Sequence, residues 1–311
     1  MKIKFTKMQA LGNDYIYVDY FKQNLSGIDL NNLARKICDR HFGVGSDGLI
    51  LIAPGKICKF RMIFHNPDGS EAEMCGNGIR CFARYLYDHG LSKKKVQNIE
   101  TKAGVITTQI IKTGMVRQAH HIKEFLIKAD IGKPILERKR IPMKDKGLVL
   151  TFVPKDSVRG KARPEGDICI NQELKLNGRK VRINSLSLGN PHTVIFVDEF
   201  RNDWKEIGSL VENHPIFPKR TNVEFVKILN PKNIRLKIWE RGVGETKASG
   251  TGACAATVAG VLNHKLDRRV KAEFDYGEIQ IEWNEKDGHL YMIGPAVETF
   301  SGIFNYIKTA G

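Results

Sequence analysis

The sequence predicts an α/β protein of the α+β type, built from two pseudo-symmetric domains. Each domain is expected to be a strongly bent, mostly antiparallel sheet or barrel around a central helix, with the active site in the cleft between the domains. Three observations lead to this prediction. Strand-type patterns outnumber helical ones, short motifs recur in the same order in both halves, and one helical run is apolar on nearly every side.

Apolar or alternating runs of strand length occur along the whole chain, and they are rich in β-branched and aromatic residues. Such residues pack well on a pleated, half-buried surface, so these runs predict strands. The expected strands are residues 2–7, 15–19, 49–53, 60–65, 105–111, 125–131, 148–153, 193–198, 222–228, 234–239, 278–283 and 289–293.

Helical patterns are fewer. One covers Leu30–Cys38, and a second follows Cys75, where apolar residues recur every three or four positions until Gly90, a natural helix end. Its counterpart, residues 253–262, is apolar nearly all round. A helix of that kind is buried on most sides, so a sheet is expected to wrap around it.

An internal repeat connects the two halves. The motif LGND at residues 11–14 returns as LGNP 177 positions later, and CGNG at residues 75–78 returns as SGTG 174 positions later. A polar residue, Asn66 or Glu240, stands nine positions before each of the second pair. Equal order and nearly equal offsets predict a duplicated domain. We expect the first domain to comprise residues 1–121 and 294–311, the second 122–293, with a linker at 118–123. Segments 132–146 and 156–166 are expected to be surface loops.

Composition sets limits on the class of protein. The content of 41% hydrophobic and 27% charged residues is that of a globular protein. No signal-peptide pattern and no apolar run of membrane length is visible, and the six cysteines show no paired framework. We therefore expect a cytoplasmic protein with free thiols that has no membrane partner. Cys38, Cys58 and Cys169 are expected to be buried structural thiols.

A net charge of +16 allows a competing interpretation, a basic nucleic-acid-binding protein. That interpretation has no zinc-ligand spacing, recognition-helix pattern or RNA-binding motif to support it. The basic clusters at residues 93–95 and 138–146 are better explained as a solvated surface, and no nucleic-acid partner is expected.

The residue types at the repeated helix starts point to proton transfer. A cysteine directly before the first turn has its thiolate stabilised by the helix dipole and by unpaired N–H groups, which lowers its pKa from about 8.5 toward neutrality. Cys75 is placed in this way and would then serve as a general base. The N–H groups at Gly76–Asn77 and Gly250–Thr251 suit a carboxylate. Two such helix starts suit stereo-inversion at a Cα atom.

The longer motifs around these positions are specific. They are KMQALGNDY at residues 7–15, DRHFGVG at 39–45, HNPDGSE at 65–71, MCGNGIRC at 74–81, GNPH at 189–192, TNVEF at 221–225 and WERGVGET at 239–246. With these motifs the chain resembles the diaminopimelate epimerase family nearly end to end. These are cofactor-independent two-thiol epimerases of lysine and cell-wall biosynthesis.

The resemblance implies epimerisation of LL-2,6-diaminopimelate to the meso form, with an amino acid as the small-molecule partner, no cofactor, no metal and a homodimer. It implies that Cys75 is one catalytic thiol and that His192 and Glu240 stand beside the thiols as proton-transfer groups. The implied substrate-binding residues are Asn13, Asn66, Gly76, Asn77, Asn190, Asn222, Glu240, Arg241, Gly250 and Thr251. An alternative for Asn13 and Asn190 is a turn role, and for Asn222 the fixing of a strand end.

The chain departs from the family pattern at Ser249, which occupies the position of the second thiol. A serine hydroxyl is a far weaker acid than a thiol, and losing an acid–base partner costs about 10²–10⁴-fold in rate. Cys254 lies one and a half turns further along the helix and is expected to be a buried small residue.

Three explanations for Ser249 remain open. It is a natural variant whose hydroxyl or a water, backed by Glu240 or Glu245, relays the second proton; or it is an engineered Cys→Ser change; or the chain is a one-base relative. The last corresponds to an isomerase or dehydratase of another amino acid that uses Cys75 only.

Overall fold

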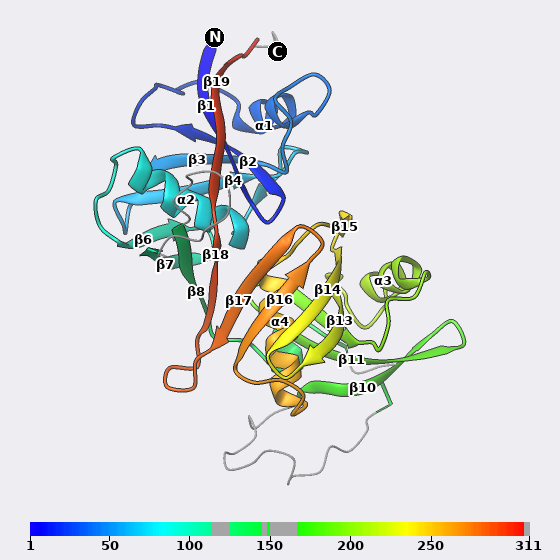
Figure 1. Cartoon of the computed structure of the whole chain (residues 1–311). Helices are drawn as coiled ribbons and strands as arrows, with labels where there is room; N and C mark the ends of the chain where they lie inside the picture. Colours follow the sequence, from blue (N-terminus) through cyan, green and yellow to red (C-terminus); the bar gives the residue numbers. More distant parts are fainter. Residues whose placement is uncertain (113–124, 145–147, 150–166, 308–311) are drawn as a thin grey trace. The chain divides into compact units, whose positions relative to one another are not determined.

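The computed structural model describes residues 1–112, 125–144, 148–149 and 167–307 (Figure 1). The chain divides into two compact units: Met1–Asp130 with Ile293–Gly311 forms unit 1, and Ile131–Met292 forms unit 2. From the sequence we expected the first change of domain after residue 121 and the return before residue 294. The expected linker at 118–123 lies outside the described residues.

Unit 1 is a sheet with two helices. Its elements are β1 (Lys2–Ala10), β2 (Asn13–Asp19), α1 (Leu30–Cys38), β3 (Leu49–Pro54), β4 (Phe60–His65), β5 (Glu71–Ala72), α2 (Gly76–Asp88), β6 (Val96–Thr101), β7 (Gly104–Lys112), β8 (Phe125–Gly132), which runs into unit 2, and β19 (Val297–Asn305). The pairs β2–β3 and β4–β6 are parallel, whereas β1–β2, β3–β4, β4–β5, β6–β7 and β7–β8 are antiparallel.

Strand β19 brings the end of the chain back to its beginning. It runs antiparallel to β1 over most of its length (Figure 1). At the end of this pair the backbone N–H of Tyr306 donates to the carbonyl of Met1 at 2.8 Å, and the terminal amine of Met1 donates to the carbonyl of Tyr306 at 2.6 Å. The sheet of unit 1 therefore contains two neighbouring strands, β1 and β19, that are far apart in the sequence.

Unit 2 repeats this arrangement. Its elements are the short 3-10 helix η1 (Arg138–Arg140), β9 (Leu148–Val149), β10 (Cys169–Leu176), β11 (Arg179–Ser187), β12 (Pro191–Phe196), α3 (Trp204–Glu212), β13 (Asn222–Asn230), β14 (Asn233–Glu240), β15 (Gly244–Thr246), α4 (Gly250–Leu262), β16 (Arg269–Phe274), β17 (Gly277–Trp283) and β18 (Leu290–Pro295), which continues into unit 1. Here β12–β13 and β14–β16 are parallel, whereas β11–β12, β13–β14, β14–β15 and β16–β17 are antiparallel.

The pairing registers of the two units also correspond. They place Tyr15 and His192 at one repeat position, Ile50 and Glu224 at a second, and Asn66 and Glu240 at a third. Both the order of the strands and their registers are therefore duplicated. The predicted α+β architecture of two pseudo-symmetric, mostly antiparallel halves is confirmed.

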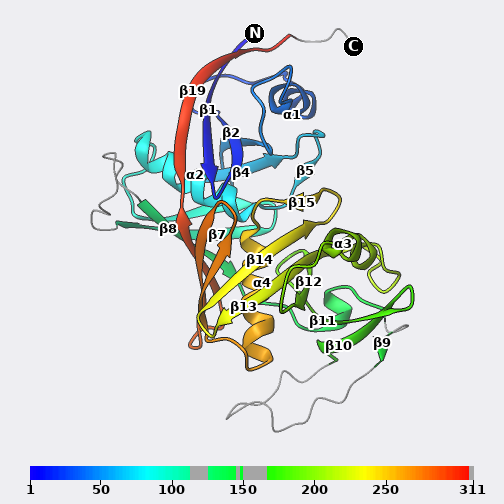
Figure 2. The ribbon, with the colours of Figure 1, turned by 45° about the vertical axis from the view of Figure 1, so that its right-hand side comes forward.

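Each unit packs its sheet around one helix. On α2 the side chains of Ile79, Phe82, Ala83 and Leu86 are completely buried, as their spacing predicts, and Gly90 follows the helix with a φ of 71°. Helix α4 is buried from Gly252 to Gly260 and contacts strands β11, β12, β13, β16 and β17 (Figure 2). Because α4 has no polar face, its stability depends on this enclosure.

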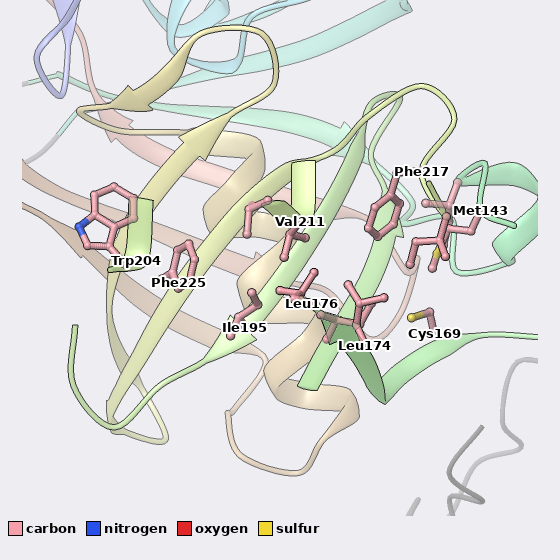
Figure 3. Close-up of a cluster of buried hydrophobic side chains, with 13 residues drawn as sticks. Met143, Cys169, Leu174, Leu176, Ile195, Trp204, Val211, Phe217 and Phe225 are labelled. Atoms are coloured by element: carbon pink, nitrogen blue, oxygen red, sulfur yellow. The ribbon is translucent and has the colours of Figure 1, made fainter. Parts of the chain in front are cut away.

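A second core in unit 2 lies beneath α3. Trp204 and Val211 of this helix are buried with residues of β10, β12 and β13 (Figure 3). The ring of Trp204 meets that of Phe225 edge-on, with 5.6 Å between centroids. Full burial of such side chains stabilises the fold by about 1.5–3 kcal/mol each. The sequence patterns did not identify α3, β10 or β11.

The prediction of a surface loop at residues 132–146 is wrong for its central part. Arg138, Ile141 and Met143 are buried, and the last two belong to the core beneath α3. Because basic residues lie between them, the segment is polar on average, and its two buried apolar residues could not be recognised from the composition. The other expected loop, 156–166, lies outside the described residues.

Among the described residues, no helix combines the length and the apolar character that a membrane span requires.

Candidate active site

The candidate site in unit 1 is built on the first turn of α2. Cys75 is the N-cap of this helix, with φ −134° and ψ 118°, and its Sγ accepts the backbone N–H of Gly78 at 3.3 Å. Position 78 requires glycine, because a Cβ atom there would lie only 2.7 Å from Cδ1 of Ile50. The sulfur is therefore held at the positive end of the helix dipole by a backbone donor, as the sequence predicted.

Ser249 occupies the equivalent place on α4. Its φ of −132° and ψ of 117° nearly equal those of Cys75, and its Oγ accepts the N–H of Gly252 at 3.0 Å. A second hydroxyl, Oγ1 of Thr251, lies 3.4 Å from Oγ. The two helix starts thus share one backbone geometry and differ in the acidity of the capping atom.

Tyr15 is a neighbour of Cys75 that was not among the predicted site residues. Its hydroxyl lies 3.0 Å from the Sγ atom of Cys75. Burial raises the pKa of the Tyr15 phenol well above its ordinary value, and the neighbouring Cys75 raises it further. The phenol therefore remains neutral and keeps its proton. The signal that could have identified it is the repeat itself, since Tyr15 stands where the second half carries His192.

A buried cation lies in the same helical turn. Arg80 is completely buried, and its guanidinium donates to the carbonyl of Gly76 at 3.3 Å and to Oδ1 of Asn77 at 2.9 Å. The positive charge adds to the potential of the helix start, which favours an anion there. The side-chain oxygen of Asn77 is thereby engaged by Arg80, so the predicted contact with substrate at Gly76–Asn77 would use backbone N–H groups.

Asn13 and Asn66 have different surroundings. Asn13 is the first residue of β2, after a tight turn formed by Leu11 and Gly12 with φ of 57° and 82°. Its Nδ2 lies 3.5 Å from the hydroxyl of Tyr15, at the long limit for a hydrogen bond. Asn66 follows β4, and its Nδ2 donates to Oγ of Ser70 at 3.0 Å. Asn13 thus lies in the surroundings of Cys75, and the only described side-chain bond of Asn66 is to the adjacent loop.

In unit 2, His192 is the centre of a buried polar chain. Its Nδ1 lies 2.7 Å from Oε1 of Glu224, and its Nε2 lies 3.0 Å from Oδ1 of Asn190. His192 and Glu224 are both completely inaccessible to solvent. A Cβ at Gly252 would lie 3.0 Å from both Oε1 of Glu224 and Oγ of Ser249, so the carboxylate packs against the first turn of α4. Glu224 was not among the site residues predicted from the sequence, although it is part of the motif TNVEF.

Asn222 fixes two neighbouring segments of unit 2. Its Nδ2 donates to the carbonyl of Pro191 at 2.8 Å, and its Oδ1 accepts the backbone N–H of Arg241 at 3.0 Å. The alternative of a strand-fixing role is therefore observed, and the substrate-binding role stays a prediction. Asn222 sets the start of the turn after Glu240, which is half-buried at the end of β14.

The same turn is held from the other side by Glu212 of α3. This buried carboxylate accepts the indole N–H of Trp239 at 2.7 Å and the backbone N–H of Gly242 at 2.8 Å. Arg241 between them is exposed, and its guanidinium donates to the carbonyl of Lys219 at 3.2 Å. Glu240 and Arg241 are thus presented by a turn whose backbone is fixed at both ends.

The remaining cysteines differ from Cys75. Burial raises the pKa of the Cys38 and Cys169 thiols to about 11 and that of Cys81 to about 12, so all three stay protonated at neutral pH. Cys254 is also buried, as expected. The prediction that Cys58 is buried is wrong, since its side chain is partly exposed after strand β3. In the described part of the chain, no group of three or more His, Cys, Asp or Glu side chains is arranged to hold a metal ion.

The structure therefore gathers nine of the thirteen predicted residues into two groups. The group at the start of α2 in unit 1 contains Asn13, Cys75, Gly76 and Asn77. The group at the start of α4 in unit 2 contains Ser249, Gly250 and Thr251, together with His192 and Asn190, which are connected to it through Glu224. The predicted cleft between the domains stays a prediction.

Comparison with known folds agrees with the duplicated architecture. A PhzF-family phenazine biosynthesis protein of Bacillus anthracis superposes with a TM-score of 0.63 at 17% identity, over 97% of this chain and 99% of that chain. A hydroxyproline epimerase of Agrobacterium vitis gives 0.62 at 12% identity, over 97% of this chain and 90% of its own. At these identities the likeness concerns the fold.

Sequence comparison is more specific. The family model for diaminopimelate epimerase matches residues 5–121 and 185–299. The diaminopimelate epimerase of Pelotomaculum thermopropionicum is 46% identical over 97% of this chain and 99% of its own, and that of Moorella thermoacetica is 44% identical over 96% and 98%. A match of this extent, over both halves and both helix starts, shows the family. This chain belongs to the diaminopimelate epimerase family.

Proposed function

We propose that this protein epimerises LL-2,6-diaminopimelate to the meso form by removing the proton from Cα on one face and returning a proton on the other. The observation that carries the proposal is the capping geometry of Cys75, which is duplicated at Ser249. A sulfur held by a backbone N–H at a helix start is suited to exist as a thiolate and to act as a general base.

The substrate carboxylate would take the unpaired N–H groups of the helix starts, at Gly76–Asn77 and at Gly250–Thr251. Neutral amide side chains at Asn13 and Asn190 offer both donors and acceptors to an amino acid, and the exposed guanidinium of Arg241 can bind a carboxylate in a forked manner. His192 and Glu240 would supply or accept protons beside the reacting carbon.

Ser249 weakens one side of this scheme. A hydroxyl is a poor base and a weak acid at neutral pH, so the face served by Ser249 depends on a neighbouring carboxylate, imidazole or water for proton transfer. The proposal therefore predicts that exchange of the α-proton through Cys75 is faster than full inversion.

The assay incubates the protein with the LL isomer in deuterated water and follows α-deuterium by mass spectrometry and stereochemistry by chiral chromatography. We expect deuterium incorporation to exceed inversion, and Ser249→Cys to raise the inversion rate by about 10²–10⁴-fold. Cys254→Ser is the matched control, because that thiol is buried on the same helix and should not affect either rate. Absence of both exchange and inversion in the wild type and in Ser249→Cys would remove the proposal.

Two further features belong to the proposal. The family resemblance implies a homodimer, so light scattering should give twice the chain mass of 35.1 kDa. All six cysteines are free thiols, which fits a reducing cytoplasmic environment.

A further inference from the structure

The hydroxyl of Tyr15 lies within hydrogen-bond distance of the Cys75 sulfur. The distance of 3.0 Å between Oη and Sγ joins residues 60 positions apart, on β2 and at the start of α2. Tyr15 is only 2% exposed, and its ring is fixed edge-on against Phe64 at 6.0 Å between centroids. A buried phenol held in this way has a fixed direction toward the sulfur.

The contact can exist in both protonation states of Cys75. When the sulfur carries a proton, S–H donates to the oxygen of Tyr15. When it is a thiolate, the hydroxyl of Tyr15 donates to the sulfur, beside the N–H of Gly78 at 3.3 Å. The amide of Asn13, 3.5 Å from the same oxygen, fits the second arrangement, because a hydroxyl that accepts from one side directs its single proton to the other.

The phenol itself does not serve as the base. Burial, followed by the negative charge of Cys75, raises the pKa of Tyr15 well above its ordinary value. The proton therefore stays on the oxygen at neutral pH, and the group acts as a donor of fixed orientation. Hydrogen bonds to a charged acceptor are about twice as strong as neutral ones, so this donor favours the thiolate over the thiol.

The internal repeat gives an independent reason to assign a role to this position. Tyr15 and His192 occupy the same register position, and each lies two residues after the repeated asparagine. In unit 2 the ring is backed by the carboxylate of Glu224, whereas in unit 1 the equivalent residue is Ile50. The imidazole of His192 therefore has a carboxylate partner, whereas the position equivalent to that carboxylate in unit 1 carries an apolar side chain. The two halves therefore place different polar rings at one position.

We propose that Tyr15 is a further residue of the active site: its hydroxyl donates a hydrogen bond to the Cys75 thiolate, and its oxygen accepts a hydrogen bond from the S–H group when Cys75 is protonated. This inference rests on the proposed function for its catalytic meaning, but the effect on the thiol is measurable without any substrate.

The test is the pH dependence of Cys75 alkylation by iodoacetamide, read by peptide mass spectrometry. Tyr15→Phe removes only the oxygen. We expect the alkylation midpoint to rise by about one to two pH units, which is the size of one charge-assisted hydrogen bond. Tyr85→Phe is the matched control: its hydroxyl lies 3.3 Å from Asp19 in the same unit, and its loss should leave the midpoint unchanged.

A second variant works in the opposite direction. Tyr15→3-fluorotyrosine makes the phenol a stronger donor and should lower the midpoint, and it keeps the test valid if Tyr15→Phe does not fold. An unchanged midpoint in both variants would overturn the proposal. A shifted midpoint in a protein that does not exchange the α-proton of diaminopimelate would support the role of Tyr15 and refute the proposed function, so the two failures are distinguishable.

Discussion

At the residue scale, the chemistry of this protein depends on which atom stands at a repeated position. Cys75 and Ser249 have nearly equal backbone angles, and each caps a helix through its side chain. The sulfur lies beside a phenol, and the hydroxyl of Ser249 lies beside a carboxylate that is bound to an imidazole. Duplication therefore preserved the geometry of the helix start while the polar groups around it became different.

Glu224 is the most unusual of these polar groups. It is completely buried, and its Oε2 has no hydrogen-bond partner among the described residues. Burying a carboxylate is costly unless it is compensated. The compensation comes from Nδ1 of His192 at 2.7 Å and from the dipole of α4, against whose first turn the carboxylate packs. The pair thereby fixes the orientation of the His192 ring.

A double-mutant cycle measures this pair. We expect Glu224→Gln and His192→Gln each to lower the free energy of unfolding, with a coupling of about 1–3 kcal/mol, because contacting buried groups do not behave additively. Urea denaturation followed by tryptophan fluorescence gives the four values. A coupling within experimental error of zero would mean that the 2.7 Å contact does not contribute to the folded state.

At the element scale, the two central helices are equivalent in length and in their ends. Both run for 13 residues, and their C-cap residues, His89 and Asn263, have φ and ψ within a few degrees of each other. The side chain at the start of each helix satisfies an N–H group that the helix leaves unpaired. In α2 the sulfur of Cys75 has two tasks: it caps the helix and, as we propose, it accepts and returns the proton of the substrate.

These two tasks can be separated by substitution. Because Ser249 fits this cap, Cys75→Ser should keep the unfolding free energy within about 0.5 kcal/mol of wild type, whereas Cys75→Ala should lower it by about 0.5–2 kcal/mol. Both variants should lose about 10²–10⁴-fold in α-proton exchange. Thermal unfolding and the deuterium assay check the two effects. Equal destabilisation by Ser and Ala would show that the capping bond of Cys75 contributes little.

At the scale of the whole molecule, the chain's two ends are part of one sheet. The C-terminal β19 pairs with β1, and Gly302 of β19 stands opposite Phe5 of β1. Phe5 is buried in the unit 1 core, and a Cβ at position 302 would come within 2.9 Å of its ring. The absence of a side chain at 302 therefore leaves space for a core residue of the N-terminal strand.

Gly302→Val tests this closure. We expect the steric overlap with Phe5 to lower the free energy of unfolding by about 1–3 kcal/mol, despite the better strand propensity of valine. Thr299→Val, an exposed position in the same strand, is the control and should change it by less than about 0.5 kcal/mol. If Gly302→Val were as stable as this control, strand β19 would have to be less closely packed on β1 than the distances indicate.

Part of the fold and of the site could be predicted from local sequence patterns. The positions of Cys75 and Ser249 before a helix, the three- and four-residue spacing on α2, and the apolar surface of α4 all report local geometry. The internal repeat is found by comparing the positions of the short motifs in the two halves of the sequence. Helix α3 was not predicted, because its buried face consists of few residues and charged residues lie between them. The buried residues include Trp204, Gly208 and Val211.

Taken by itself, the sequence determined the family, the duplicated α+β fold, and both helix-capping positions, because these depend on short-range periodicity and motif identity. Only the tertiary structure decided that Tyr15 lies on Cys75, that Glu224 lies on His192, and that Ile141 and Met143 enter a core. Such contacts join residues far apart in the chain. Their formation depends on strand register and on how each sheet curves around its helix, and neither is encoded in any single window of residues.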